Sequence, residues 1–233
     1  MTKFTQYYTA HQVRELERLA IQEHHIPGFA LMQRAGNASF HALFSQWPAV
    51  TQLIIFCGTG NNGGDGFVIA GLAMRAGLKV EVFVFGKLTA ISGDALKAFE
   101  FAREQNVSIR FVEEPPSLAT PSSGTVIVDA LLGTGLSGEV RTLFRQAIEA
   151  INHSDLPVLA IDIPSGLCSD TGAVLGACVK ADLTVTFIGK KIGLVVGSGP
   201  AMCGKVIFDD LAVPAAIYGH IKGIDVPEEV GAA

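Results

Sequence analysis

The chain has 233 residues, of which 49% are hydrophobic and 17% charged, and its formal net charge at pH 7 is −5. This length suits one α/β domain with a large core, and the negative charge argues against a nucleic-acid partner. No apolar run reaches the ~18 residues that cross a bilayer, and no signal peptide is visible. We therefore expect neither a nucleic-acid nor a membrane partner.

Two helices are predicted ahead of the first strand. Residues 9–23 have apolar side chains at helical spacing, and Thr9 suits the N-cap of that helix. Pro27 and Gly28 end the pattern, and a second helix is expected over about 29–44. We expect these helices to form an N-terminal extension of an α/β core.

The next stretch has the pattern of a nucleotide site. An apolar run, Leu53–Cys57, indicates a strand buried on both faces. Gly58–Gly66 is predicted to be a glycine-rich loop, and Phe67–Ala76 a helix that ends before Gly77. Backbone N–H groups at the start of such a helix can bind a phosphate, and glycines let the ligand approach the backbone.

Strands and helices then alternate along the chain. We expect two further helices, at Asp94–Gln105 and Arg141–Asn152, and six further strands, at Lys79–Phe85, Ser108–Phe111, Thr125–Asp129, Val158–Asp162, Leu183–Phe187 and Lys205–Asp209. This order predicts an α/β fold of three layers, with helices on both faces of a mostly parallel sheet. We expect one domain over residues 1–216, and a tail or linker over 217–233, where periodicity is weak.

Three of the predicted strands end in polar or glycine-rich sequence, namely CGTGNNGGDG, VDALLGTGLSGE and IDIPSG. Ligands of open α/β sheets bind beyond the carboxyl ends of the strands. We therefore expect five polar side chains to converge on one crevice: Asn62, Asp65, Asp129, Asp162 and Ser165.

Each of these residues also has a purely structural interpretation. Asp65 can be the N-cap of the following helix, and the two asparagines of the loop can serve a left-handed turn. Asp129 and Asp162 can bond the backbone of their own turns, and Ser165 can be an ordinary turn residue. The cysteines (Cys57, Cys168, Cys178, Cys203) and the six histidines show no metal-ligand spacing, so we expect reduced thiols in a cytoplasmic protein.

A nicotinamide dehydrogenase is the obvious alternative. Gly58, Gly60 and Gly63 satisfy G-x-G-x-x-G, but that pattern alone is weak. The fingerprint also needs an acidic residue about 20 positions later to hold the ribose, and none is present over 83–86. A P-loop is excluded because no G-K-[ST] follows the glycines.

The three strand-end motifs, in this order, resemble those of the NAD(P)H-hydrate epimerase family, also called the YjeF N-terminal domain. The resemblance extends from PGFALMQRAG through TFIGKKIGL and the last strand. It implies a Rossmann-like fold that interconverts the R and S forms of hydrated NADH or NADPH at ring C6. It also implies a homodimer, a bound potassium ion, and an ADP- or ATP-dependent dehydratase that consumes the S form.

The resemblance assigns roles to particular residues. It places the potassium ligands at Asn62, Asp129 and Ser165, whose oxygen donors suit this hard ion. It places substrate contacts at Asn61, Asn62, Gly63, Gly64, Asp65, Gly133, Thr134, Gly135, Leu136, Ser137, Gly138, Glu139 and Asp162.

Epimerisation requires the C6 hydroxyl to leave and water to return on the other face. Asp162 is our first candidate for the acid or base, and Lys191 is a candidate charge partner, although the adjacent Lys190 makes that assignment ambiguous. A ring-opening route is an alternative that the sequence does not separate from this one.

Two further alternatives concern the whole chain. Relatives of this domain act as binding modules without catalysis, but here the loop asparagines and the aspartates are retained, which favours an enzyme. Many bacterial relatives are fused to the dehydratase, so we expect either a stand-alone epimerase or a fragment of a fusion.

Overall fold

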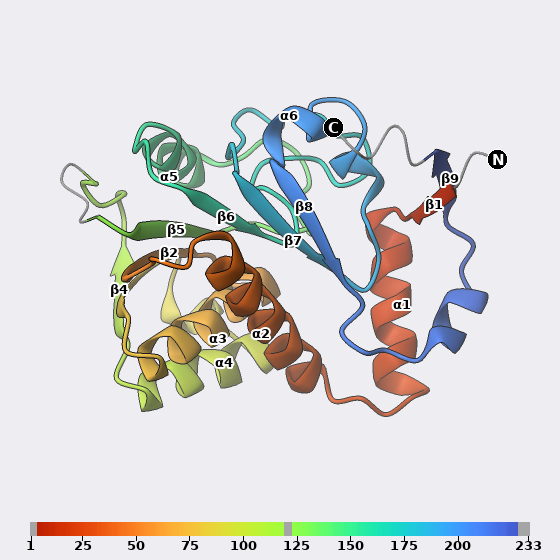
Figure 1. Cartoon of the computed structure of the whole chain (residues 1–233), viewed down its shortest axis with the longest axis horizontal. Helices are drawn as coiled ribbons and strands as arrows, with labels where there is room; N and C mark the ends of the chain where they lie inside the picture. The colour runs from red at the N-terminus through yellow and green to blue at the C-terminus, as the bar shows by residue number, and fades with distance from the viewer. Residues whose placement is uncertain (1–3, 119–122, 228–233) are drawn as a thin grey trace.

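A seven-stranded sheet crosses the centre of the molecule, and every neighbouring pair of its strands is parallel (Figure 1). The computed structural model describes residues 4–118 and 123–227. In spatial order the strands are β4 (Ser108–Val112), β3 (Lys79–Phe85), β2 (Gln52–Cys57), β5 (Thr125–Ala130), β6 (Val158–Ile161), β7 (Leu183–Phe187) and β8 (Lys205–Asp209). This is Rossmann-like order, with the chain reversing direction across the sheet between β2 and β5. The predicted fold class is confirmed.

Helices cover both faces of this sheet. Those on one face are α2 (Gly28–Gln46), α3 (Asn61–Arg75) and α4 (Gly93–Glu104), and α5 (Thr142–Asn152) lies on the other (Figure 1). Successive residues of β2 alternate between two apolar clusters, with Leu53 and Ile55 in one and Ile54 and Phe56 in the other. A strand that is buried on both faces needs such a continuous apolar run.

Helix α1 (Ala10–Gln22) forms the predicted N-terminal extension together with α2. Thr9 caps α1 through a capping box, in which its hydroxyl accepts the N–H of Gln12 and its own N–H donates to the Gln12 side chain. Before α1, the short strand β1 (Phe4–Tyr7) pairs antiparallel with β9 (Ile224–Pro227) at the other end of the described chain. Neither of these strands was predicted.

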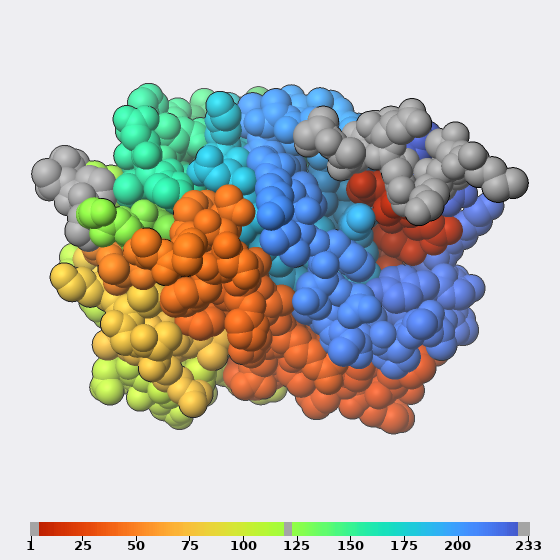
Figure 2. Space-filling model, viewed as in Figure 1, coloured from red at the N-terminus to blue at the C-terminus, as the bar shows by residue number. Residues whose placement is uncertain are grey.

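The described part of the stretch after residue 216 packs against the N-terminal elements. Ile217 in the 3₁₀ helix η3 (Ala215–Gly219) is fully buried, and the Tyr218 hydroxyl donates to the Ile188 carbonyl at 2.7 Å. Figure 2 shows N-terminal and C-terminal atoms side by side at this end of the molecule. The domain boundary at 216 stays a prediction, and residues 228–233 lie outside the described residues.

The start of α3 corrects one prediction. The helix begins at Asn61, not Phe67, so most of the expected glycine loop forms its first turns. Glycines disfavour a helix in isolation, but here they let α3 approach its neighbours. A Cβ at Gly64 would lie 2.6 Å from Met32, and one at Gly66 would lie 2.7 Å from both Cys57 and Ala130.

The remaining short elements are η1 (Leu88–Ala90), η2 (Ile192–Leu194) and α6 (Gly199–Met202). Among residues 4–118 and 123–227, no helix combines the length and the apolar character that crossing a bilayer requires.

Candidate active site

A cavity of about 600 Å³ lies at the carboxyl ends of the central strands. Its walls come from α1, from the starts of α2 and α3, from the segment 131–144 after β5, and from residues that follow β6, β7 and β8. The cavity therefore includes the point between β2 and β5 where the strand order reverses, which is where open α/β sheets bind their ligands.

Most of the residues that the sequence indicated line this cavity. The structure places there Asn61, Asn62, Asp65, Gly133, Thr134, Gly135, Leu136, Ser137, Glu139, Asp162 and Lys191. Gly63, Gly64 and Gly138 are not part of the walls, and Asp129 and Ser165 are buried outside them. Of the five side chains expected in one crevice, Asn62, Asp65 and Asp162 therefore line it, whereas for Asp129 and Ser165 the expectation is wrong, because both are fully buried. The role of each residue stays a prediction.

Asp162 directly follows β6 and faces the cavity. Its backbone is left-handed, with φ of 67°, a conformation that aspartate tolerates better than most residues. Its N–H donates to the Val185 carbonyl at 2.7 Å, so β7 fixes its position. The side chain retains 17% exposure, which leaves the carboxylate accessible to a ligand.

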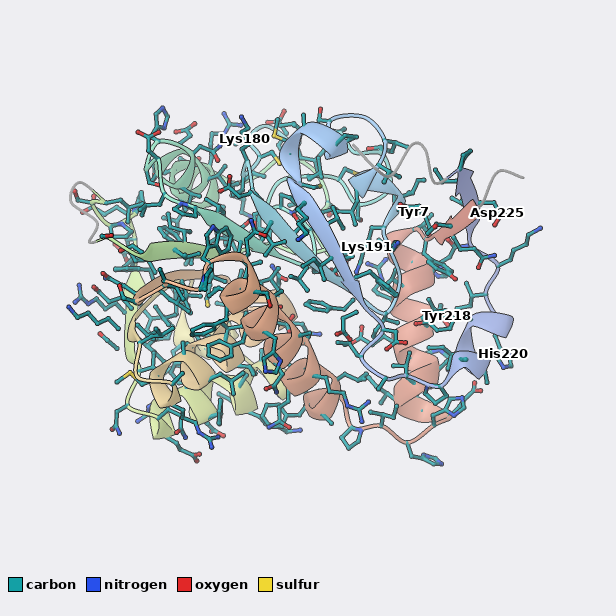
Figure 3. All side chains as sticks on the ribbon, viewed as in Figure 1. Tyr7, Lys180, Lys191, Tyr218, His220 and Asp225 are labelled. Carbon is teal, nitrogen blue, oxygen red and sulfur yellow. The ribbon has the colours of Figure 1, made fainter. Side chains whose placement is uncertain are left out.

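Lys191 forms a buried salt bridge with Asp162. Its side chain is only 1% exposed, and its ammonium donates to Asp162 Oδ1, to Thr186 Oγ1 at 3.0 Å and to the Phe187 carbonyl at 3.0 Å. Three acceptors satisfy all three N–H donors of an ammonium. In Figure 3, Lys191 lies between the central sheet and α1. The structure thus holds a positive charge in a fixed position beside Asp162.

The structure separates Lys191 from its neighbour Lys190. The Lys190 ammonium lies 5.9 Å from the ring centroid of Tyr7 and 5.7 Å from that of Phe208, and Lys190 does not line the cavity. Successive residues of an extended chain point to opposite sides, and Lys191 forms an isolated bridge with Tyr8. The ambiguity in the sequence is resolved in favour of Lys191 as the residue beside Asp162.

Further carboxyl groups line the cavity, from Glu17, Asp65 and Asp94. Burial raises the pKa of Asp65 well above its usual range, and the charges of Asp162 and Glu17 raise it further. Asp65 is not the N-cap of α3, because Gly60 has that position and the helix already includes Asp65. The structural interpretation of Asp65 as a cap is therefore wrong.

Asp129 and Ser165 form a buried pair beneath the cavity. The Ser165 hydroxyl donates to Asp129 Oδ1 at 2.6 Å, and the Ser165 N–H donates to Oδ2 at 2.8 Å. Asp129 also accepts the N–H of Leu131 at 3.3 Å, which is the local turn bond that its structural interpretation predicted. Burial raises the pKa of Asp129 to about 6, although these hydrogen bonds act in the opposite direction.

Among the described residues, Asn62 is the one whose buried side-chain polar atoms lack hydrogen-bond partners. Neither its Oδ1 nor its Nδ2 has a hydrogen-bond partner there, and an unsatisfied buried amide costs about 1–3 kcal/mol. The Asn62 carboxamide packs against Gly133. The preceding residue, Leu132, donates its N–H to Ser165 Oγ at 2.9 Å, so Asn62, Ser165 and Asp129 adjoin one short segment of chain.

Sequence reasoning missed several residues that line this cavity. Arg14 and Glu17 come from α1 and Arg141 precedes α5, all outside the motifs. The sequence did contain one indication of this, because Glu17 lies four residues after Val13 and therefore on the apolar face of α1. A carboxylate on such a face needs an explanation.

Comparisons with known proteins agree with this geometry. The model of the family described as "YjeF-related protein N-terminus" matches residues 28–193. The chain belongs to this family. The crystal structure of the yeast protein YNL200c has the same fold, with a TM-score of 0.79, 17% identity, and coverage of 96% of this chain and 100% of that one.

Curated relatives of this YjeF-related chain carry two kinds of name. An NAD(P)H-hydrate epimerase of Limosilactobacillus fermentum is 37% identical over 88% of this chain and 96% of its own length. The bifunctional NAD(P)H-hydrate repair enzyme Nnr of Coxiella burnetii is 46% identical over 92% of this chain. The chain spans only 43% of that relative's length, and 43% of the similarly named protein of Vibrio cholerae.

Proposed function

We propose that the protein is an NAD(P)H-hydrate epimerase, which interconverts the R and S forms of hydrated NADH and NADPH at ring C6. The observation that carries this proposal is the buried salt bridge between Lys191 and Asp162, which faces a cavity at the dinucleotide position of a Rossmann-like sheet. The names of the relatives that match over most of their own length support the same activity.

The cavity has the features that a dinucleotide requires. The N-terminus of α3 presents backbone N–H groups with partial positive charge, and Gly60 and Asn61 line the cavity there. The segment 133–139 forms the adjacent wall, with Arg14 and Arg141 as cations for the phosphates. Its volume of about 600 Å³ lies within the range of small-molecule sites.

Asp162 provides the acid–base chemistry. The ring nitrogen expels the C6 hydroxyl, and a carboxylate on the cavity wall accepts the proton of the water that returns. Lys191 holds that carboxylate in place without exposing its own ammonium. The alternative ring-opening route needs the same carboxylate, because it also transfers protons to and from the C6 oxygen.

The test is direct turnover. We expect the protein to convert purified R-epimer of hydrated NADPH to the S-epimer faster than the spontaneous reaction does. Chromatographic separation of the two epimers measures the conversion. Heat-inactivated protein gives the spontaneous rate. A protein that binds NADPH but leaves the rate unchanged would instead be a binding module of the same fold.

We also propose that a potassium ion binds beside the cavity, held by Asn62, Asp129 and Ser165. The unpartnered Asn62 amide and the adjacent buried carboxylate and hydroxyl are an oxygen donor set that a hard monovalent cation fits. When bound, the ion supplies positive charge beneath a ligand that carries phosphates.

Potassium should therefore stabilise the protein. At equal ionic strength, we expect KCl to raise Tm relative to choline chloride. When the potassium concentration is about 100 times Kd, the added free energy of unfolding is about 2.7 kcal/mol. Asn62→Leu should abolish this response without lowering Tm in choline chloride, because it removes an amide that has no partner among the described residues. Asn61→Ala, at an exposed neighbour, is the matched control. An equal response in Asn62→Leu would contradict the site.

The remaining expectations concern partners. We propose that the S-epimer passes to an ADP- or ATP-dependent dehydratase, and the relatives that are named bifunctional NAD(P)H-hydrate repair enzymes support this proposal. We also propose a homodimer and a cytoplasmic location, and light scattering of the purified protein tests the dimer.

A further inference from the structure

Helix α1 packs directly on the segment that carries Lys191. A Cβ at Gly189 would lie 3.1 Å from Val13 and 3.4 Å from Leu16, so the helix and this segment are in close contact. Tyr8 brackets Lys191 from the same side, because its N–H donates to the Lys190 carbonyl and its own carbonyl accepts the N–H of residue 192. The orientation of α1 over the cavity is therefore fixed at its start.

This contact directs Glu17 into the cavity. Glu17 follows Val13 by one turn on the same face of α1, and both residues line the cavity wall together with Asp162 and Lys191. Among residues 4–118 and 123–227, the carboxyl of Glu17 makes no hydrogen bond and no ion pair. The adjacent Glu15, in contrast, forms an exposed ion pair with Arg18.

The surroundings of Glu17 favour its protonated form. Burial raises the pKa of its carboxyl, Asp162 and Asp94 raise it further, and Lys191 acts in the opposite direction. The other charged side chains that line the cavity are Arg14, Asp65, Asp94, Glu139, Arg141, Asp162 and Lys191. Lys191 is the one amine among them, and it is already bonded to Asp162.

We propose that Glu17 is the second acid–base residue of the epimerase, and that it exchanges protons with the C6 oxygen on the ring face opposite to Asp162. The proposal rests on the proposed function. Two carboxyl groups whose environments differ, one paired with a cation and one not, are the arrangement in which one acts as base and the other as acid.

One water leaves and one water adds, and after each turnover exchange with solvent returns the proton from Asp162 to Glu17, so no reactant other than water is needed. As the C6–O bond breaks, its electron pair stays on oxygen, Glu17 transfers its proton to that oxygen, and water leaves. The nitrogen lone pair meanwhile forms a C6=N bond. Water then adds to the other face of C6, the C=N electron pair returns to nitrogen, and the proton of the water passes to Asp162. The reverse reaction uses the same two groups with their roles exchanged.

Glu17→Gln tests the proposal, with Glu15→Gln as the matched control on the same helix. We expect Glu17→Gln to lower kcat at least ~100-fold while KM stays within about 3-fold, because the lost interaction occurs only in the transition state. Wild-type kcat should fall at high pH as Glu17 loses its proton, and that limb of the profile should be absent in the variant. Glu17→Asp, which keeps a carboxyl, should recover part of the rate.

Stability separates catalysis from a structural role. A carboxyl with a raised pKa in the folded state destabilises the fold above its ordinary pKa, because the unfolded chain then binds fewer protons. Glu17→Gln should therefore equal or exceed wild-type stability at pH 7 in urea titration, and the gain should vanish at pH below the ordinary glutamate pKa.

The outcomes are distinct. Suppose that the wild-type protein turns over hydrated NADPH and that Glu17→Gln retains kcat within about 3-fold. The proposal for Glu17 is then wrong, and the proposed epimerase activity stands. If the wild-type protein gives no acceleration, the proposed function fails, and the role of Glu17 fails with it.

Discussion

Asp162→Asn should lower epimerase kcat by about 100- to 10,000-fold, the usual contribution of a positioned acid–base group. Asparagine is the informative replacement because it tolerates the left-handed backbone, with φ of 67°, that residue 162 adopts. The loss then reports the carboxylate, without backbone strain. Turnover of the R-epimer of hydrated NADPH, corrected for the spontaneous rate, is the measurement.

The same substitution should also destabilise the protein. It leaves the Lys191 ammonium, which is 1% exposed, without its anionic partner. Removing one member of a buried ion pair costs up to about 3–5 kcal/mol, and the residual 17% exposure of Asp162 places the expected cost at the lower end. Low activity alone is therefore not proof of a catalytic role.

The double variant Asp162→Asn/Lys191→Met separates loss of catalysis from loss of stability. It removes both charges, so we expect most of the lost stability in urea titration to return while kcat stays as low as in Asp162→Asn. Lys190→Met is the matched control, because Lys190 lies over Tyr7 and Phe208 rather than in the cavity, and it should retain turnover. Restored turnover in the double variant would remove Asp162 from the mechanism.

The sheet was predictable because its strands carry their own signal. β3, β7 and β8 have the bounds that the sequence indicated, since each is a largely apolar run between turn residues. β1 and β9 were missed, because each has four residues and its pairing joins opposite ends of the chain. The local sequence pattern of a strand does not show which distant segment will pair with it.

The site was predictable where strand ends carry it. Asp162 follows a strand, and the rule for open sheets was enough to place it in the crevice. Lys191 was identified only through the resemblance to a known family, and only the backbone geometry distinguished it from Lys190. Glu17 could not be placed, because its position in the cavity depends on how α1 docks on residues that lie far along the chain.

The start of α3 shows why glycine misleads local prediction. In an exposed helix, Gly→Ala gains about 1 kcal/mol of stability, which is why Gly63 was assigned to a loop. At Gly63, however, a Cβ would overlap the backbone carbonyl of Gly58, which belongs to the turn after β2. A backbone atom cannot rotate aside as a side chain can. The steric cost of a Cβ at Gly63 therefore exceeds the gain in helix propensity, and Gly→Ala destabilises the protein at this position.

We therefore expect Gly63→Ala to destabilise the protein by about 3 kcal/mol or more, at the upper end of overpacking costs. Gly60→Ala is the matched control from the same segment, since a Cβ there meets nothing within 4 Å and its φ of −92° suits alanine. Because Gly60 is the N-cap of α3, where alanine is less favourable than glycine, that variant should lose no more than about 1 kcal/mol. Urea denaturation measures both. A gain of stability in Gly63→Ala would show that the close contact between α3 and Gly58 is absent, and with it the geometry that brings the helix N-terminus to the cavity.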